Sequence, residues 1–190
     1  QAYEFTEKVE ESKRLSKENK ILQNRYKNLN EQSKLDELAN VLNRRGFMEA
    51  GQKAIDFALE MNLVALVVFG DMNGLKTIND TYGHKIGDLA IKLESYVIKS
   101  AFRESDVVGR LSGDEFGVVA PGFPSRKIDY LREKLIKLNE KVSKENDLPF
   151  TLSISVGCVD FSPASCDFQT LLKQADEKLY EEKRIKHSRR

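Results

Sequence analysis

One continuous apolar run, rich in β-branched residues, limits the folds that this chain can adopt. Residues 63–69 read Leu-Val-Ala-Leu-Val-Val-Phe. The run is too short to span a membrane, and its length and composition indicate a buried central strand. Asp71 follows at the exit of this strand. The sequence therefore predicts a central strand that delivers a carboxylate to one edge of a sheet.

A tight turn with two adjacent acids lies between two further short apolar runs. Residues 111–116 read Leu-Ser-Gly-Asp-Glu-Phe, and a Gly-Asp pair is typical of a hairpin tip. Taken alone, this turn is an ordinary solvated hairpin. Asp114 and Glu115 on this turn, together with Asp71, would instead supply oxygen ligands from neighbouring strands, which suits Mg²⁺.

Two helices are predicted in the middle of the chain. Apolar spacing predicts a helix over residues 89–102, with Asp88 at its start. A Pro- and Gly-containing loop over residues 121–125 follows the hairpin, and Ser125 is placed to cap a helix over residues 126–144.

The C-terminal part of the domain contributes a strand and a helix. Polar and apolar residues alternate over residues 150–159, which predicts a half-buried strand. Asp167 is placed to cap a last helix with one apolar face. The hairpin and the crossover helices together predict an α/β (α+β) domain with a mixed, mostly antiparallel sheet flanked by helices.

Residues 1–34 contain no Gly or Pro and form a separate N-terminal region before the domain of residues 35–190. Leu15, Leu22 and Leu29 are seven residues apart and occupy heptad position d, which also receives Lys8. The a positions then hold Phe5, Ser12, Asn19 and Tyr26. The pattern favours a two-stranded coiled coil with a polar Asn at its seam; the alternative is a solvated single helix.

Composition indicates an ordinary cytoplasmic domain. The net charge is +1, so bulk charge gives no reason to expect a nucleic-acid or membrane partner. Cys158 and Cys166 are too few for a disulfide framework, and no signal peptide or transmembrane run is visible. Because the chain opens at Gln1, we expect it to be a piece of a longer protein, with an upstream sensor or membrane anchor.

Four blocks in order resemble the GGDEF family of diguanylate cyclases, between Leu35 and Lys183. They are residues 36–47, residues 71–88, the signature turn at residues 112–116 (here Ser-Gly-Asp-Glu-Phe), and residues 175–183. The resemblance implies the palm-like fold of nucleotidyl cyclases and polymerases. It also implies that two GTP molecules are condensed into cyclic di-3′,5′-GMP with release of two pyrophosphates, with Mg²⁺, or Mn²⁺, as cofactor.

The resemblance also implies a role for each matching residue. Asp71, the backbone carbonyl of Met72 and Asp114 match the metal-holding positions, and Asp114 and Glu115 match the position that accepts the proton of the ribose hydroxyl. Asn79 and Asp88 match the guanine-binding residues. The remaining substrate-binding residues are Gly74, Leu75, Lys76 and Lys183 for the phosphates and His84 in a supporting role. Without the resemblance, Asp88 is equally a helix cap and Asn79 a surface polar group.

Each such domain binds one GTP, so the resemblance implies a homodimer with facing half-sites. Arg103 and Asp106 match the RxxD site at which cyclic di-GMP inhibits the family; the alternative is an exposed ion pair. Ser112 replaces the first signature Gly, and His187 stands where the family often has Arg. Two rival classes remain: a catalytically silent domain that senses GTP or cyclic di-GMP, and a coiled-coil adaptor with an inert domain.

Overall fold

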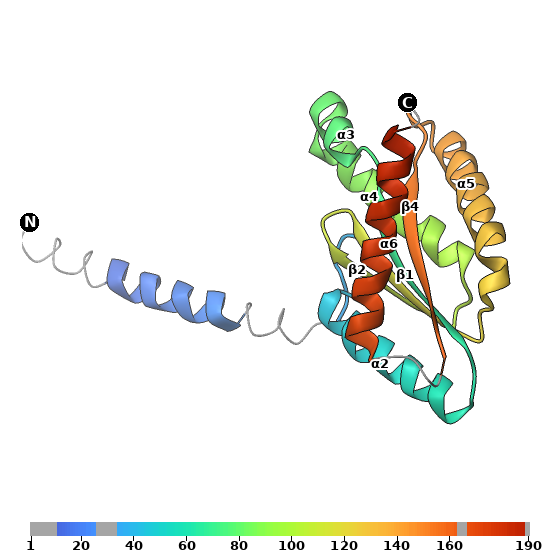
Figure 1. Ribbon diagram of the computed structural model, residues 1–190. Helices are drawn as coiled ribbons and strands as arrows, with labels where there is room; N and C mark the ends of the chain where they lie inside the picture. The colour runs from blue at the N-terminus through green and yellow to red at the C-terminus, as the bar shows by residue number, and fades with distance from the viewer. Residues whose placement is uncertain (1–10, 26–33, 163–166, 189–190) are drawn as a thin grey trace, which may run out of the picture. The chain divides into compact units, whose positions relative to one another are not determined.

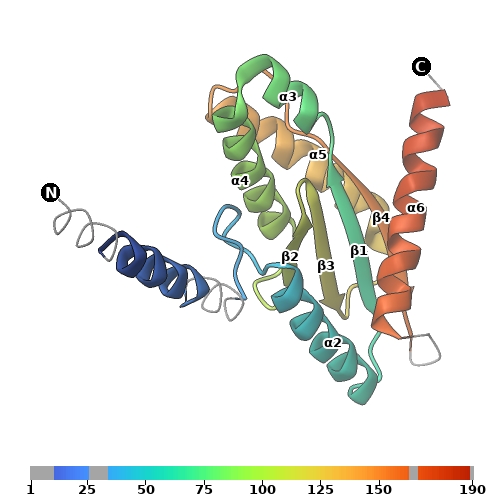
Figure 2. The same ribbon diagram turned by 90° about the vertical axis from the view of Figure 1, so that its left-hand side faces the viewer.

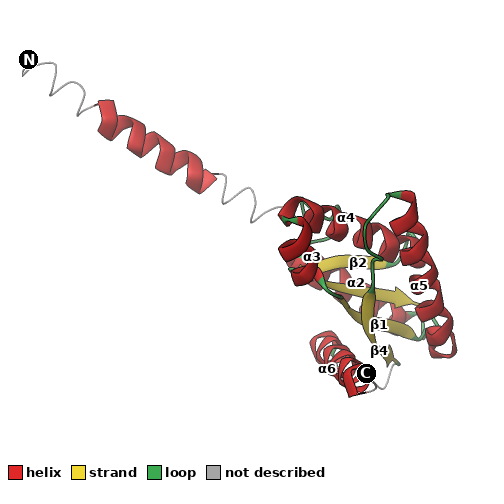
Figure 3. Ribbon diagram, turned by 90° about the horizontal axis from the view of Figure 1, so that it is seen from above, coloured by secondary structure: helices red, strands yellow, loops and turns green. Residues whose placement is uncertain are grey.

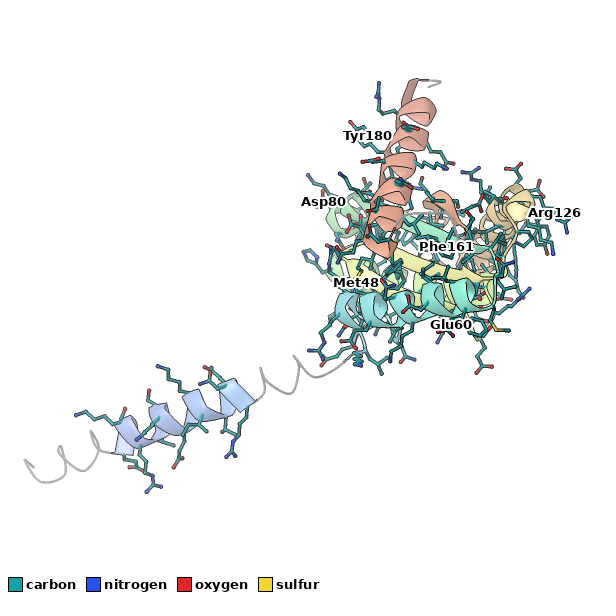
Figure 4. All side chains as sticks on the ribbon, turned by 60° about the horizontal axis from the view of Figure 1, so that its bottom comes forward. Met48, Glu60, Asp80, Arg126, Phe161 and Tyr180 are labelled. Carbon is teal, nitrogen blue, oxygen red and sulfur yellow. The ribbon has the colours of Figure 1, made fainter. Side chains whose placement is uncertain are left out.

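The computed structural model describes residues 11–25, 34–162 and 167–188 of the chain and divides the chain into two compact units, residues 1–34 and 35–190. In the first unit, residues 11–25 are helical, and side chains project from all sides of this helix (Figure 4). Leu15 and Leu22 are 52% and 61% exposed. Leu29 and the a-position residues Phe5 and Tyr26 lie outside the described residues, so the coiled coil stays a prediction.

The second unit is an α+β domain built on a four-stranded sheet (Figure 1). Its elements in chain order are α2 (Arg44–Glu60), β1 (Ala65–Met72), α3 (Leu75–Tyr82), α4 (His84–Ala101), β2 (Val107–Ser112), β3 (Glu115–Pro121), a 3₁₀ turn (Ser125–Lys127), α5 (Ile128–Glu145), β4 (Ile154–Phe161) and α6 (Phe168–Ser188). The predicted central strand, hairpin and last helix are confirmed.

The strand order is β2-β3-β1-β4, and the pairings between these neighbours are antiparallel. One isolated parallel bridge joins Leu42 to Gly109. The β1 strand lies between β3 and β4, and six of its eight residues in succession, Ala65–Gly70, are buried. This burial explains why its sequence is an uninterrupted apolar run.

Helices cover both faces of the sheet (Figures 1 and 2). On one face, α2 and α6 pack through a cluster that includes Phe47, Phe168 and Leu171. On the other face, α3, α4 and α5 pack through a cluster that includes Ile78, Ile98 and Leu135. Successive residues of β1 contribute to alternate clusters, as the pleat of a strand requires.

Close contact between α6 and β4 depends on Gly157. A Cβ atom at this position would lie 1.9 Å from the carbonyl oxygen of Ala175 and 2.5 Å from the amide nitrogen of Leu179. The backbones of strand and helix therefore approach to a distance that a larger residue would prevent. This contact fixes α6 directly over the sheet.

Two predicted helix starts were wrong. The α4 helix begins at His84, so Asp88 lies inside the helix, and Gly83, with φ of 85°, serves as the N-cap. Gly83 also ends α3, so a single residue separates the two helices. Ser125 opens the 3₁₀ turn rather than capping α5, which begins at Ile128 without a side-chain cap.

The last strand also differs from the prediction, whereas the last cap does not. The β4 strand covers Ile154–Phe161 and is buried on both faces over most of its length, because α6 packs on one side and α5 on the other. Asp167 caps α6 as predicted: its Oδ1 accepts from the amide of Thr170 at 3.0 Å. No helix among the described residues is long and apolar enough to cross a membrane.

Candidate active site

Two acids from neighbouring strands face each other at the end of the sheet. Asp71 of β1 pairs with Glu115 of β3, and the amide of Met72 donates to the carbonyl oxygen of Asp114 at 2.9 Å. The pair is therefore of the non-hydrogen-bonded type, in which the Cα atoms are about 4.5 Å apart and the side chains are close. Both side chains lie on the face that α2 and α6 cover, since the odd-numbered residues of β1 pack there.

Negative charge accumulates around Glu115. Burial raises the pKa of this carboxyl group, and the charges of Asp114, Asp176 and Asp71 raise it further, whereas Arg44 lowers it. Four carboxylates therefore interact at one place, and such mutual repulsion favours a bound cation. We predicted no role for Asp176 or Arg44 from the sequence, although both lie within the blocks that carry the family resemblance.

Lys183 of α6 supplies a positive charge to this cluster. Its Nζ lies 2.5 Å from Oδ1 of Asp71, and the side chains of Lys183 and Asp71 are 31% and 23% exposed. We predicted that Lys183 binds phosphate; here it contacts a predicted metal ligand. The carboxylate and the ammonium group therefore neutralise each other at the position where a cation would bind.

The donor set fits a hard divalent cation. In the described part of the chain, no group of three or more His, Cys, Asp or Glu side chains is arranged to hold a metal ion. The predicted set of Asp71, Asp114 and the Met72 carbonyl contains only two carboxylates. This suits Mg²⁺, which prefers oxygen ligands and commonly completes its shell with water and substrate phosphates.

The amino end of α3 lies just beyond the acids. Gly74, the N-cap of α3, has φ of 78° and leaves the first amides of the helix without a side-chain cap. Leu75 and Lys76 form the first turn, and the Lys76 side chain is exposed. Uncapped amides at a helix start are suited to phosphate oxygens. Asn73 holds this segment to β4: its side chain donates to Ser153 at 3.0 Å and accepts from Ser155 at 3.0 Å.

The two residues predicted to read guanine lie on adjacent helices. A Cβ on Gly87 of α4 would lie 1.8 Å from Oδ1 of Asn79 of α3, so the Asn79 amide rests directly against the helix beside Asp88. Asp88 is exposed and Asn79 is half-buried. The structure thus places Asn79 against α4 one residue from Asp88, while His84 lies exposed at the start of α4.

The side chain of Arg110 links the signature turn to Asp36. Its Nε donates to the carbonyl oxygen of Gly113 at 2.8 Å, and its Nη1 lies 3.1 Å from Oδ1 of Asp36. Gly113 has the positive φ of the turn, and Ser112 belongs to β2. Positive φ at described residues other than glycine occurs only at Asn40, Asn62 and Asp147, so the serine that replaces the first signature Gly has an ordinary backbone conformation.

Arg103 and Asp106 lie at the other end of β2 from the acids. The six residues of β2 span about 20 Å. The amide of Arg103 donates to Oδ2 of Asp106 at 2.9 Å, and both residues line a groove of about 330 Å³ together with Asn40 and Lys99. Burial raises the pKa of Asp106, whereas the backbone hydrogen bond from Arg103 and the charge of Arg103 lower it in part.

Comparison with known proteins gives the same family as the motifs. The family model described as "Diguanylate cyclase, GGDEF domain" matches residues 33–189. The chain is 32% identical over 154 residues to the probable diguanylate cyclase DgcC of Escherichia coli K12, covering 81% of this chain and 42% of that protein. It is 30% identical over 187 residues to the cyclic di-GMP phosphodiesterase NbdA of Pseudomonas aeruginosa, covering 94% of this chain and 24% of that protein. The chain thus spans less than half the length of either relative.

The fold has a close counterpart among solved structures. The coiled coil and GGDEF domain of DgcB from Caulobacter crescentus, determined in complex with c-di-GMP, superposes with a TM-score of 0.69 at 22% identity, covering 89% of this chain and 90% of that one. The fold of this chain is therefore shared with that structure. The chain belongs to the GGDEF diguanylate cyclase family.

Proposed function

We propose that this domain is a diguanylate cyclase that condenses two GTP molecules into cyclic di-3′,5′-GMP and releases two pyrophosphates. The observation that carries the proposal is the pairing of Asp71 with Glu115, next to Asp114, at the end of the sheet. Both the family match and this concentration of carboxylates beside a helix start support it. We also propose a cytoplasmic setting, because GTP is supplied there.

The reaction requires a new ester bond at an α-phosphorus. The ribose 3′-oxygen of one GTP attacks the α-phosphorus of the other, the bond to the β-phosphate oxygen breaks, and pyrophosphate departs in line. The reciprocal attack by the second 3′-oxygen closes the ring and releases the second pyrophosphate. Asp71, Asp114 and the Met72 carbonyl would hold a divalent cation, Mg²⁺ or Mn²⁺, which would supply charge neutralisation at the phosphates and acidify the attacking hydroxyl. Glu115 or Asp114 accepts the proton of that hydroxyl.

Other residues of the domain bind and orient the nucleotide. The Asp88 carboxylate accepts from guanine N1–H and N2–H₂, and Asn79 completes recognition of the base edge, which favours GTP over ATP. The α3 amides at Gly74 and Leu75, with Lys76, bind phosphate. When nucleotide binds, the Lys183 ammonium group moves from the Asp71 carboxylate to a β- or γ-phosphate oxygen. The Asp71 carboxylate is then available to the metal ion.

Two further features complete the proposal. Each domain binds one GTP, so two protomers face each other, and dimerisation through the N-terminal helix raises the local concentration of the second half-site. Cyclic di-GMP binds at Arg103 and Asp106 and inhibits the enzyme; a guanidinium fork and a carboxylate suit its phosphate and guanine.

Product formation tests this function directly. The purified chain at high concentration is incubated with GTP and Mg²⁺, and cyclic di-GMP and pyrophosphate are separated by chromatography. An Asp114→Ala/Glu115→Ala variant serves as the control. We expect the parent to form product and the Asp114→Ala/Glu115→Ala variant to form none.

A silent sensor domain is the second candidate. The similarity to NbdA, which is named as a phosphodiesterase, and the contact between Lys183 and Asp71 favour it. If the parent binds GTP or cyclic di-GMP but forms no product at any enzyme concentration, the function of the domain is that of a sensor and not of a cyclase. If the parent neither binds nucleotide nor forms product, the adaptor is favoured.

A further inference from the structure

The turn of α6 that carries Lys183 follows the last buried residue described in this helix. Leu179 is the last buried residue of α6 in the range up to Arg184, for which burial is described. Tyr180, one residue further on, is 65% exposed and lies on the outer part of the helix (Figure 4). Lys183 lies one turn beyond Leu179, and ion pairs of Glu182 and Lys183 contribute to the position of this turn.

Arg132 of α5 supplies such a contact from the other face of the sheet. Its Nη2 donates to Oε2 of Glu182, the neighbour of Lys183, at 3.2 Å. The two helices lie on different sides of the edge strand β4 (Figure 3), so this ion pair joins them around its outer edge. Nη1 of Arg132 also lies 3.6 Å from Oδ1 of Asp129 in its own helix.

The pair is partly shielded from solvent. The side chains of Arg132 and Glu182 are 39% and 24% exposed, and Nε of Arg132 is buried. Partial burial reduces screening by water and salt, so the pair is stronger than a fully exposed ion pair.

We propose that Arg132 is a positioning residue that acts through Glu182 to hold the Lys183 turn of α6 over the nucleotide phosphates. The inference rests on the proposed function, in which Lys183 leaves Asp71 for a phosphate. During that exchange the contact between Lys183 and Asp71 is absent, and the pair formed by Arg132 and Glu182 keeps the turn in place. Glu182 and Lys183 are consecutive, so displacement of one displaces the other.

Amide hydrogen exchange tests the positioning without any nucleotide. Arg132→Met, Glu182→Gln and the double variant are compared with the parent, and Lys141→Met, which removes an ion pair of 3.7 Å with Glu145 at the far end of the same helix, is the matched control. We expect the amides of residues 180–184 to exchange about fivefold faster in each single variant, a change equivalent to about 1 kcal/mol. The double variant should be no faster, because both single variants remove the same contact. Equal exchange in parent and variants would overturn the proposal.

Steady-state kinetics then connects the turn to phosphate binding. Arg132→Met and Glu182→Gln should each raise KM for GTP about fivefold with kcat within twofold of the parent, and the double variant should match the single variants. A purely structural role would lower the folded fraction and hence the apparent kcat at unchanged KM, and that result would refute positioning. If the parent forms no product, the proposed function fails, and the exchange rates alone decide whether Arg132 holds this turn.

Discussion

Glu94 carries a titratable group in the core of the domain, and its replacement by Gln should change how stability depends on pH. Glu94 of α4 is fully buried, and neither of its carboxylate oxygens has a hydrogen-bond partner among the described residues. Burial raises the pKa of Glu94 from 4.5 to about 7, although the nearby Asn139 amide of α5 lowers it in part. The folded protein therefore holds this carboxyl group neutral under conditions in which the unfolded chain ionises it.

The sign and size of the effect follow from proton linkage. Between pH 4.5 and about 7 the folded state binds one more proton than the unfolded state, so raising the pH favours unfolding. The stabilising effect of the proton is fully present below pH 4.5 and is lost as the pH rises through about 7. At 1.36 kcal/mol for each pKa unit, the loss is about 3 kcal/mol, a large part of the stability of a typical domain.

Urea unfolding at several values between pH 4.5 and 8 measures this loss. We expect the free energy of unfolding of Glu94→Gln to gain about 3 kcal/mol relative to the parent over this range, because the amide cannot ionise. Glu140→Gln, one residue from Asn139 and exposed, is the control and should leave the pH dependence as it is. A difference between Glu94→Gln and the parent that stays constant with pH would show that Glu94 does not titrate in this range.

Three further substitutions probe the site and the packing that supports it. Arg103→Ala should weaken inhibition by cyclic di-GMP at least tenfold, a loss of about 1.4 kcal/mol, as measured by product-inhibition assays; unchanged inhibition would remove the RxxD site from the account. Asp88→Asn should raise KM for GTP by about tenfold or more, since a charged hydrogen-bond acceptor is lost, and should reduce discrimination against ATP; equal selectivity would place the guanine contact elsewhere. Gly157→Ala should lower the free energy of unfolding by about 2 kcal/mol or more, because its Cβ would clash with the Ala175 carbonyl and overpacking is costly. If Gly157→Ala unfolds at the same denaturant concentration as the parent, the predicted clash does not destabilise the domain.

The sequence predicted the parts of the fold whose signals are local. The β1 run, the hairpin at residues 111–116 and the Asp167 cap each depend on residues close together in the chain. The start of β4 was misplaced because Thr151, Leu152 and Ser153 already alternate like a strand, although the Leu152 amide donates to the Ser143 hydroxyl at the end of α5.

The parts of the site that depend on tertiary packing could not be predicted from local patterns. The start of α4 was missed because Gly83 alone separates it from α3, and a one-residue break leaves no loop signal. The contacts of Lys183 with Asp71 and of Arg132 with Glu182 join residues 112 and 50 positions apart. They depend on how α6 packs over the sheet, which the periodicity of a single helix does not predict.

The stoichiometry of the products decides whether this domain is a diguanylate cyclase. The parent and Asp114→Ala/Glu115→Ala are incubated with GTP and Mg²⁺ at equal concentration, and pyrophosphate and cyclic di-GMP are quantified in the same sample. We expect two pyrophosphates for each cyclic di-GMP in the parent and neither product in the variant. Nucleotide binding by the parent without pyrophosphate release, or equal product from both proteins, would contradict it.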